Sequence, residues 1–142
     1  MDDNTGSGAD SLDDKSGNNN HADLNNMDDS NWRPGVMGSG LVFDGSAENA
    51  TVNPATTFHN MASFTLSTWV YPRSDGPSGI GRIISKGNWS FYVSDSGSTG
   101  DLGFYRVTSG TEVRAEAADN SLPANTWSHV AVTWDGTLTA ST

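Results

Sequence analysis

The chain has 142 residues, a formal net charge of −10 and no cysteine. This length fits one modest globular domain and excludes two full ones. Without cysteine there are no disulfides, no thiolate chemistry and no cysteine-based zinc sites. The seven basic side chains are scattered singly, and no apolar run approaches the roughly 18 residues of a membrane helix. We therefore expect neither nucleic-acid binding nor membrane insertion.

The first 31 residues differ in composition from the rest. They hold eight acidic side chains and one lysine, and no aromatic residue. Gly, Ser, Asn and Asp dominate, and these residue types favour turns. We expect residues 1–31 to be an acidic, partly flexible loop segment that belongs to the start of the domain. The strands are expected within residues 32–136, and residues 137–142 are expected to form a tail.

The apolar pattern of the remaining sequence predicts an all-β protein. Helical periodicity is nearly absent, and β-branched and aromatic residues dominate the apolar set. Short runs separated by turn clusters are typical of an antiparallel sandwich or barrel. The predicted strands are residues 40–44, 50–53, 63–71, 82–86, 89–94, 102–108, 111–117 and 126–134. Tight hairpin turns are predicted at residues 87–88 and 109–110.

Two predicted strands carry bulky side chains on both faces. In residues 63–71 and 126–134, the even-numbered side chains lie on one face and the odd-numbered side chains on the other, because side chains in a strand alternate with a period of two. Strands of this kind have something packed on each side. We expect Trp69 and Trp127 to be large anchors that fill the layer between two sheets.

Five sequence blocks make the pattern more specific. Residues 13–24 read DDKSGNNNHADL, and residues 32–45 read WRPGVMGSGLVFDG. Further blocks are FTLSTWVYP at 64–72, RIISK at 82–86 and LPANTWSHVAVTWDG at 122–136. In this order they resemble the laminin G-like branch of the concanavalin A-like lectin/glucanase superfamily. The resemblance implies an antiparallel two-sheet jelly-roll sandwich. Members of that branch carry further strands before the first block and after the last, so we expect a jelly roll incomplete at both ends.

Glucanases of this superfamily work with a close set of carboxylates. The nearest arrangement is Glu112, Arg114 and Glu116, which alternation places on one face of a strand. An arginine between two acids neutralises them and does not prepare one to act as a general acid. We expect a solvated strand face and no enzymatic activity.

Carbohydrate binding needs an aromatic plate together with groups that hydrogen-bond sugar hydroxyls. The candidates for such a surface are Trp89, Tyr92, Tyr105 and Arg106, which lie beside a hairpin or on neighbouring predicted strands. The alternative is that they are ordinary core or edge residues, since a period of two buries one member of each adjacent aromatic pair.

Calcium is the cofactor that the resemblance suggests, because superfamily members often hold one at a rim of the sandwich. Asp13 and Asp14 in the acidic segment and Asp44 after a predicted strand are the candidate ligands. Their spacing does not fit a standard calcium loop, and solvated turn residues are the favoured alternative.

The sequence thus predicts a non-catalytic recognition module that binds carbohydrate or glycoconjugate within a larger secreted or surface protein. The alternative is a structural or adhesive module that binds protein on an extracellular or virion surface. The resemblance places the chain outside the cell, at a cell surface or on a virion.

Overall fold

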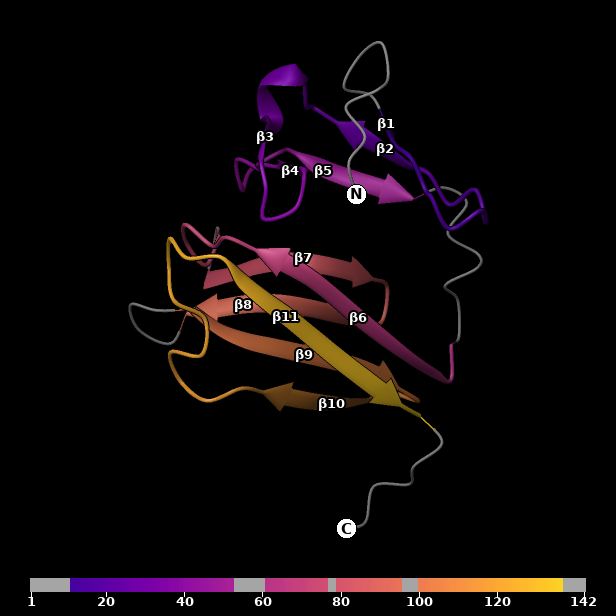
Figure 1. Ribbon diagram of the computed structural model, residues 1–142. Helices are drawn as coiled ribbons and strands as arrows, with labels where there is room; N and C mark the ends of the chain where they lie inside the picture. Colours follow the sequence, from indigo (N-terminus) through magenta and orange to yellow (C-terminus); the bar gives the residue numbers. More distant parts are fainter. Residues whose placement is uncertain (1–10, 53–60, 77–78, 96–99, 137–142) are drawn as a thin grey trace. The chain divides into compact units, whose positions relative to one another are not determined.

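A computed structural model describes residues 11–52, 61–76, 79–95 and 100–136 (Figure 1). These residues form short strands and turns with one three-residue 3-10 helix, which confirms the predicted all-β class. The chain divides into two compact units, Met1–Met61 and Ala62–Thr142. We name them the N-terminal unit and the C-terminal unit. The predicted tail at 137–142 lies outside the described residues.

The N-terminal unit contains two small antiparallel sheets. One has the order β1-β2-β5, and the other pairs β3 with β4. The elements are β1 (Ser11–Leu12), β2 (Ala22–Asn25), η1 (Asp29–Asn31), β3 (Trp32–Pro34), β4 (Ser39–Leu41) and β5 (Asn49–Val52). The segment before residue 32 therefore holds two strands and a helical turn, where the sequence predicted only a loop. These strands are too short for a period of two to stand out in the sequence.

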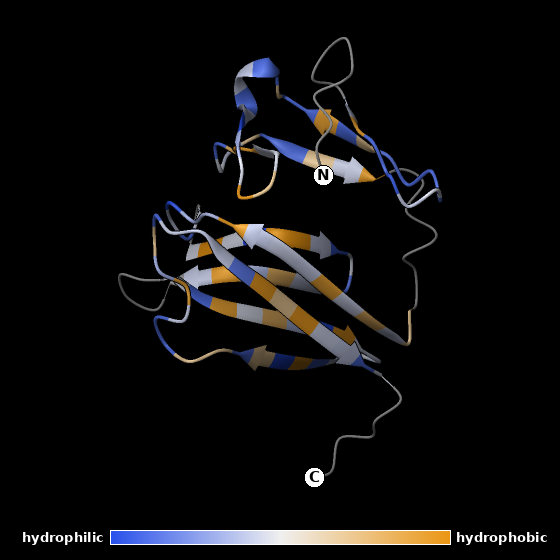
Figure 2. Ribbon diagram, viewed as in Figure 1, coloured by the Kyte–Doolittle hydropathy of each residue, from blue (hydrophilic) through white to orange (hydrophobic). Residues whose placement is uncertain are grey.

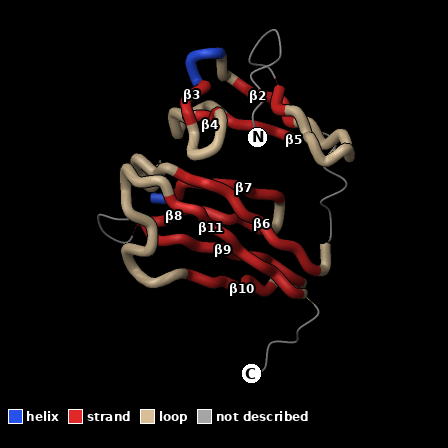
Figure 3. The backbone as a smooth tube through the Cα atoms, viewed as in Figure 1, coloured by secondary structure: helices blue, strands red, loops and turns tan. Residues whose placement is uncertain are grey.

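The C-terminal unit is a two-layer sandwich. Its larger sheet has the order β10-β9-β8-β7, and β6 pairs with β11 to form the second layer. The strands are β6 (Ser63–Val70), β7 (Ile80–Lys86), β8 (Trp89–Asp95), β9 (Gly100–Thr108), β10 (Thr111–Glu116) and β11 (Ser128–Asp135). Figures 1 and 3 show β6 and β11 crossing one face of the four-stranded sheet. All pairings are antiparallel, as predicted.

Both predicted hairpin turns are confirmed. Lys86 pairs with Trp89 across one two-residue turn, and Thr108 pairs with Thr111 across the other. In the second turn Ser109 and Gly110 have φ angles of 51° and 80°. Two consecutive left-handed residues match the twist of the flanking strands, and a residue without a Cβ adopts that conformation without strain.

The core lies between the two layers of the C-terminal unit. Its buried residues are Trp89, Phe91, Val93, Phe104, Leu122 and Val130. Partly buried side chains of β6 and β11 pack against them, and the Phe64 ring lies 5.3 Å from that of Trp89. Figure 2 shows the alternation of apolar and polar residues along these strands. Each layer thus turns one apolar face toward the core.

The expectation that Trp69 and Trp127 fill the inter-sheet layer is wrong. Both lie on the outer face of the β6–β11 layer, with 41% and 40% of their surface exposed. Because Phe64 and Leu66 face the core, the period of two turns Trp69 outward. Trp69 stacks on His129 at 5.2 Å, and Tyr71 stacks on Trp127 at 5.5 Å. We call these four rings the outer aromatic cluster.

Candidate ligand-binding face

The register between β8 and β9 separates the four predicted ligand-binding residues into two pairs. Trp89 lies opposite Arg106, and both point into the layer occupied by the core. Tyr92 lies opposite Gly103 on the other face of the same sheet. Tyr105 also lies on that outer face, because it is the neighbour of Arg106 in β9 and adjacent side chains of a strand point to opposite faces. The structure therefore brings Tyr92 and Tyr105 together and removes Trp89 and Arg106 from them.

Trp89 and Arg106 serve the core. Only 5% of the Trp89 surface is exposed, so its ring offers no free face to a sugar. The Arg106 guanidinium carbon lies 5.1 Å from the ring centroid of Trp134 and 5.9 Å from that of Phe64. Such cation–π contacts stabilise a guanidinium beside aromatic rings. For these two residues the alternative interpretation, a packing role, fits the geometry.

Tyr92 lies flat across the outer face of the sheet. A Cβ on Gly103 would come within 2.4 Å of the tyrosine ring, so the missing side chain is what makes room for it. The Tyr92 hydroxyl reaches β10, where it donates to Glu116 Oε1 at 3.2 Å and accepts from Arg114 Nη1 at 3.3 Å. Burial raises the pKa of this phenol above its usual value. Tyr92 is only 2% exposed, so it is a buried member of this outer surface.

Arg114 and its two glutamates form an ion-pair network beside Tyr105. Arg114 donates to Glu112 Oε1 from Nε at 3.0 Å and from Nη2 at 2.7 Å, and to Glu116 Oε1 from Nη1 at 3.4 Å. All three side chains are about half exposed. Hydrogen bonding to Glu112 raises the pKa of the Arg114 guanidinium above its usual value, so it stays charged.

The aromatic member of the site is Tyr105, which faces Arg114 across the β9–β10 pair. The Arg114 guanidinium carbon lies 5.9 Å from the Tyr105 ring centroid, and the Tyr92 ring lies 6.0 Å from it. We call the set Tyr92, Tyr105, Glu112, Arg114 and Glu116 the polar–aromatic face. It combines an aromatic ring with a guanidinium and two carboxylates, the groups that recognise sugar rings and hydroxyls.

From sequence alone, Glu112, Arg114 and Glu116 are expected only to form a solvated strand face. A signal for their association with Tyr105 was present in the predicted turn at residues 109–110. Counting outward from a two-residue turn fixes the register, and that register places Tyr105 beside Arg114.

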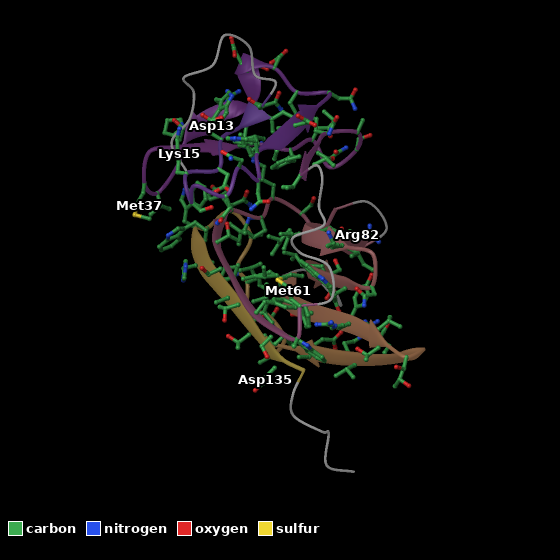
Figure 4. The ribbon with its side chains drawn as sticks, turned by 90° about the vertical axis from the view of Figure 1, so that its right-hand side faces the viewer. Asp13, Lys15, Met37, Met61, Arg82 and Asp135 are labelled. Atoms are coloured by element: carbon green, nitrogen blue, oxygen red, sulfur yellow. The ribbon has the colours of Figure 1, made fainter. Side chains whose placement is uncertain are left out.

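In the N-terminal unit, the carboxylates of Asp13 and Asp14 are occupied by groups of their own turn. Asp14 accepts from the amide of Ser16 at 2.8 Å and from the amide of Asn20 at 2.9 Å. Asp13 pairs with Lys15 at 3.1 Å (Figure 4). Both carboxylates therefore bind groups of their own turn.

Asp44 also closes a turn, because its Oδ1 accepts from the amides of Ser46 and Ala47 at 2.7 and 3.2 Å. Within the described ranges, no group of three or more His, Asp or Glu side chains is placed to hold a metal ion. Calcium binding by these residues stays a prediction.

The Asp14 turn gives a prediction about acid. Hydrogen bonds from Ser16 and then from the amide of Asn20 lower the pKa of Asp14 from 3.8 to about 2. A lowered pKa means that the folded turn favours the carboxylate, so its contribution is complete above pH 4 and is lost as the pH falls toward 2. We expect the Asp14 carboxyl to titrate near pH 2 by NMR, well below Asp14 in a peptide of residues 11–22. Equal midpoints in the two would contradict the turn described here.

A comparison with protein families finds one match, which covers most of the residues described above. The model of the concanavalin A-like lectin/glucanases superfamily, in its laminin G type, matches residues 44–141. The chain belongs to this superfamily. The matched range includes every strand of the C-terminal unit and the whole polar–aromatic face, and it confirms the resemblance inferred from the sequence blocks. Neither a curated protein nor a solved structure matches the chain.

Membership of the concanavalin A-like superfamily in its laminin G type supports a non-catalytic binding module. In the parts of the chain that the structure describes, no helix is long and apolar enough to cross a membrane.

Proposed function

We propose that the chain is a non-catalytic module that binds carbohydrate or glycoconjugate through the polar–aromatic face. The observation that carries the proposal is the position of Tyr105, an aromatic ring beside Arg114 with two half-exposed carboxylates next to it. An aromatic ring stacks on the C–H face of a sugar, while carboxylates and a guanidinium hydrogen-bond its hydroxyls. In keeping with the superfamily, the setting is a secreted or surface protein, with a virion surface as the alternative.

The same geometry argues against hydrolysis. A glycosidase needs one carboxylic acid to protonate the leaving group and a second carboxylate on the other side of the bond. Here the Arg114 guanidinium occupies the space between Glu112 and Glu116 and donates to both. A scissile bond and its water would have to displace it.

Replacing Tyr105 by alanine is expected to weaken polysaccharide binding about tenfold, because the stacking surface is lost. Affinity gel electrophoresis on a panel of polysaccharides measures the effect. Tyr105→Phe keeps the ring and should retain most of the binding. The matched control is Trp127→Ala, which removes an exposed ring from the outer aromatic cluster. Retardation that survives Tyr105→Ala but is lost in Trp127→Ala would contradict this site.

A protein-binding, adhesive function is the second candidate, and the outer aromatic cluster favours it. Trp69, Tyr71 and Trp127 are each about 40% exposed, and tryptophan and tyrosine are enriched at protein interfaces. If no polysaccharide retards the wild-type chain, with or without calcium, the adhesive function is favoured.

Running each gel with calcium chloride and again with a chelator also tests calcium binding, since retardation that is lost on chelation supports a bound ion.

A further inference from the structure

We propose that the polar–aromatic face selects neutral glycans and rejects sulfated or uronic-acid glycans. The inference rests on the proposed function and adds the ligand class. It follows from the charges on the face rather than from its aromatic ring.

The guanidinium of Arg114 is already committed. Three of its nitrogens donate to Glu112 and Glu116 at 2.7 to 3.4 Å, and one of them also reaches the Tyr92 hydroxyl. A sulfate or carboxylate ligand could use this guanidinium only by displacing a glutamate that is fixed to the same strand. Charge-assisted hydrogen bonds of this kind are among the stronger ones in proteins.

The two glutamates outnumber the arginine, so the triad carries a net charge of −1 when all three are ionised. An anionic ligand placed against Tyr105 therefore lies near two carboxylates and only one cation, which is already paired with them. Because like charges repel, this arrangement disfavours the anionic ligand. The C-terminal unit as a whole has seven acidic and five basic side chains, and its net charge of −2 acts in the same direction.

The other cations of the four-stranded sheet lie away from Glu112 and Glu116. Arg106 faces the core, and Lys86 lies opposite Trp89 on that same side. Arg82 is exposed and pairs with Tyr92 on the outer face, but it lies on β7, two strands from Tyr105 and at the opposite edge of the sheet from β10 (Figure 4). Three strand spacings separate these edges, which amounts to about 14 Å.

A neutral sugar meets none of these obstacles. The hydrogen bonds described for Glu112 and Glu116 run through Oε1 of each, which leaves Oε2 of each to accept from sugar hydroxyls. The internal ion pairs also hold these acceptors in place before a ligand arrives, which reduces the entropy lost on binding.

The test compares neutral polysaccharides with their sulfated derivatives on the same backbone, dextran with dextran sulfate and laminarin with laminarin sulfate, together with heparin. Affinity gels at low salt are run with the full wild-type chain. We expect at least tenfold stronger retardation by a neutral member than by its sulfated partner. Retardation by a sulfated partner equal to or greater than that by the neutral member would overturn the inference and leave the proposed function standing. No retardation by any polysaccharide would overturn both.

A charge switch tests the cause. The double variant Glu112→Gln, Glu116→Gln changes the triad from −1 to +1 and frees Arg114. We expect it to gain salt-sensitive binding to heparin and to lose affinity for neutral glycans several-fold, while circular dichroism verifies the fold. Adding Arg114→Gln should remove the gain, whereas adding Arg82→Gln should not. A folded double variant that gains no heparin binding would contradict the charge argument. If the double variant does not fold, the comparison of neutral and sulfated polysaccharides with the wild-type chain is the deciding test.

Discussion

Replacing Trp89 by alanine is expected to destabilise the C-terminal unit by about 3–5 kcal/mol. Trp89 is 5% exposed and contacts the second layer through Phe64, at 5.3 Å between ring centroids. It also packs beside Phe104 within its own sheet, at 6.4 Å. Truncation leaves a cavity where the two layers meet, and the rigid strands on each side cannot close it. Since domains of this size are stable by only about 5–15 kcal/mol, this loss would remove a large part of the free energy of unfolding.

Urea unfolding followed by circular dichroism measures this loss. Trp127→Ala is the matched control, because it removes the same side chain from the outer face, where 40% of it is exposed. Its main contact is the ring of Tyr71 at 5.5 Å, so we expect a loss of about 1 kcal/mol. Equal shifts of the two midpoints would mean that the layer is not filled by Trp89.

The hairpins of the C-terminal unit could be predicted from sequence because their signals are local. Two residues that tolerate left-handed backbone, flanked by β-branched and aromatic residues, specify both the turn and the register. The pairings across residues 87–88 and 109–110 follow from this alone. The strands of the N-terminal unit could not be found in the same way, because β1 and β2 have two and four residues.

Which face of a strand is buried could not be predicted in this way, because alternation shows which residues share a face but not which face is covered. Phe91 and Tyr92 are adjacent, as are Phe104 and Tyr105, and the sequence left open which member of each pair is buried. The phenylalanines face β6 and β11, while the tyrosines face outward. The same ambiguity misplaced Trp69, whose strand covers the core with its other side. Only the tertiary pairing of the two layers resolves it.

The candidate site could be predicted in part for the same reason. Tyr92 and Tyr105 fall on one face as neighbours, whereas Trp89 and Arg106 fall on the other. The contribution of Arg114 depends on the β9–β10 register, and the flat position of Tyr92 depends on a glycine one strand away. Such cross-strand complementarity has no signature within either strand's own sequence.

Gly103 gives the sharpest test of how the polar–aromatic face is built. An added Cβ would lie 2.4 Å from Cζ of Tyr92 and 2.6 Å from its hydroxyl oxygen, which is far inside van der Waals contact. Gly103→Ala should therefore lift the Tyr92 ring and break its hydrogen bonds to Glu116 and Arg114. Overpacking of this kind destabilises by about 1–3 kcal/mol. Glycan binding should fall in parallel, because Tyr92 no longer holds Glu116 and Arg114 in place.

A double-mutant cycle with Tyr92→Ala separates this clash from the backbone effect of the substitution. Alanine restricts the unfolded chain more than glycine does, so where it fits without strain it stabilises by about 0.4–1 kcal/mol. In the Tyr92→Ala background the clash is absent, and Gly103→Ala should become neutral or stabilising. The sign change measured by urea unfolding would assign the cost to the tyrosine ring, since residues in contact give non-additive effects. Equal losses in both backgrounds would instead mean that position 103 requires glycine for a reason unrelated to Tyr92.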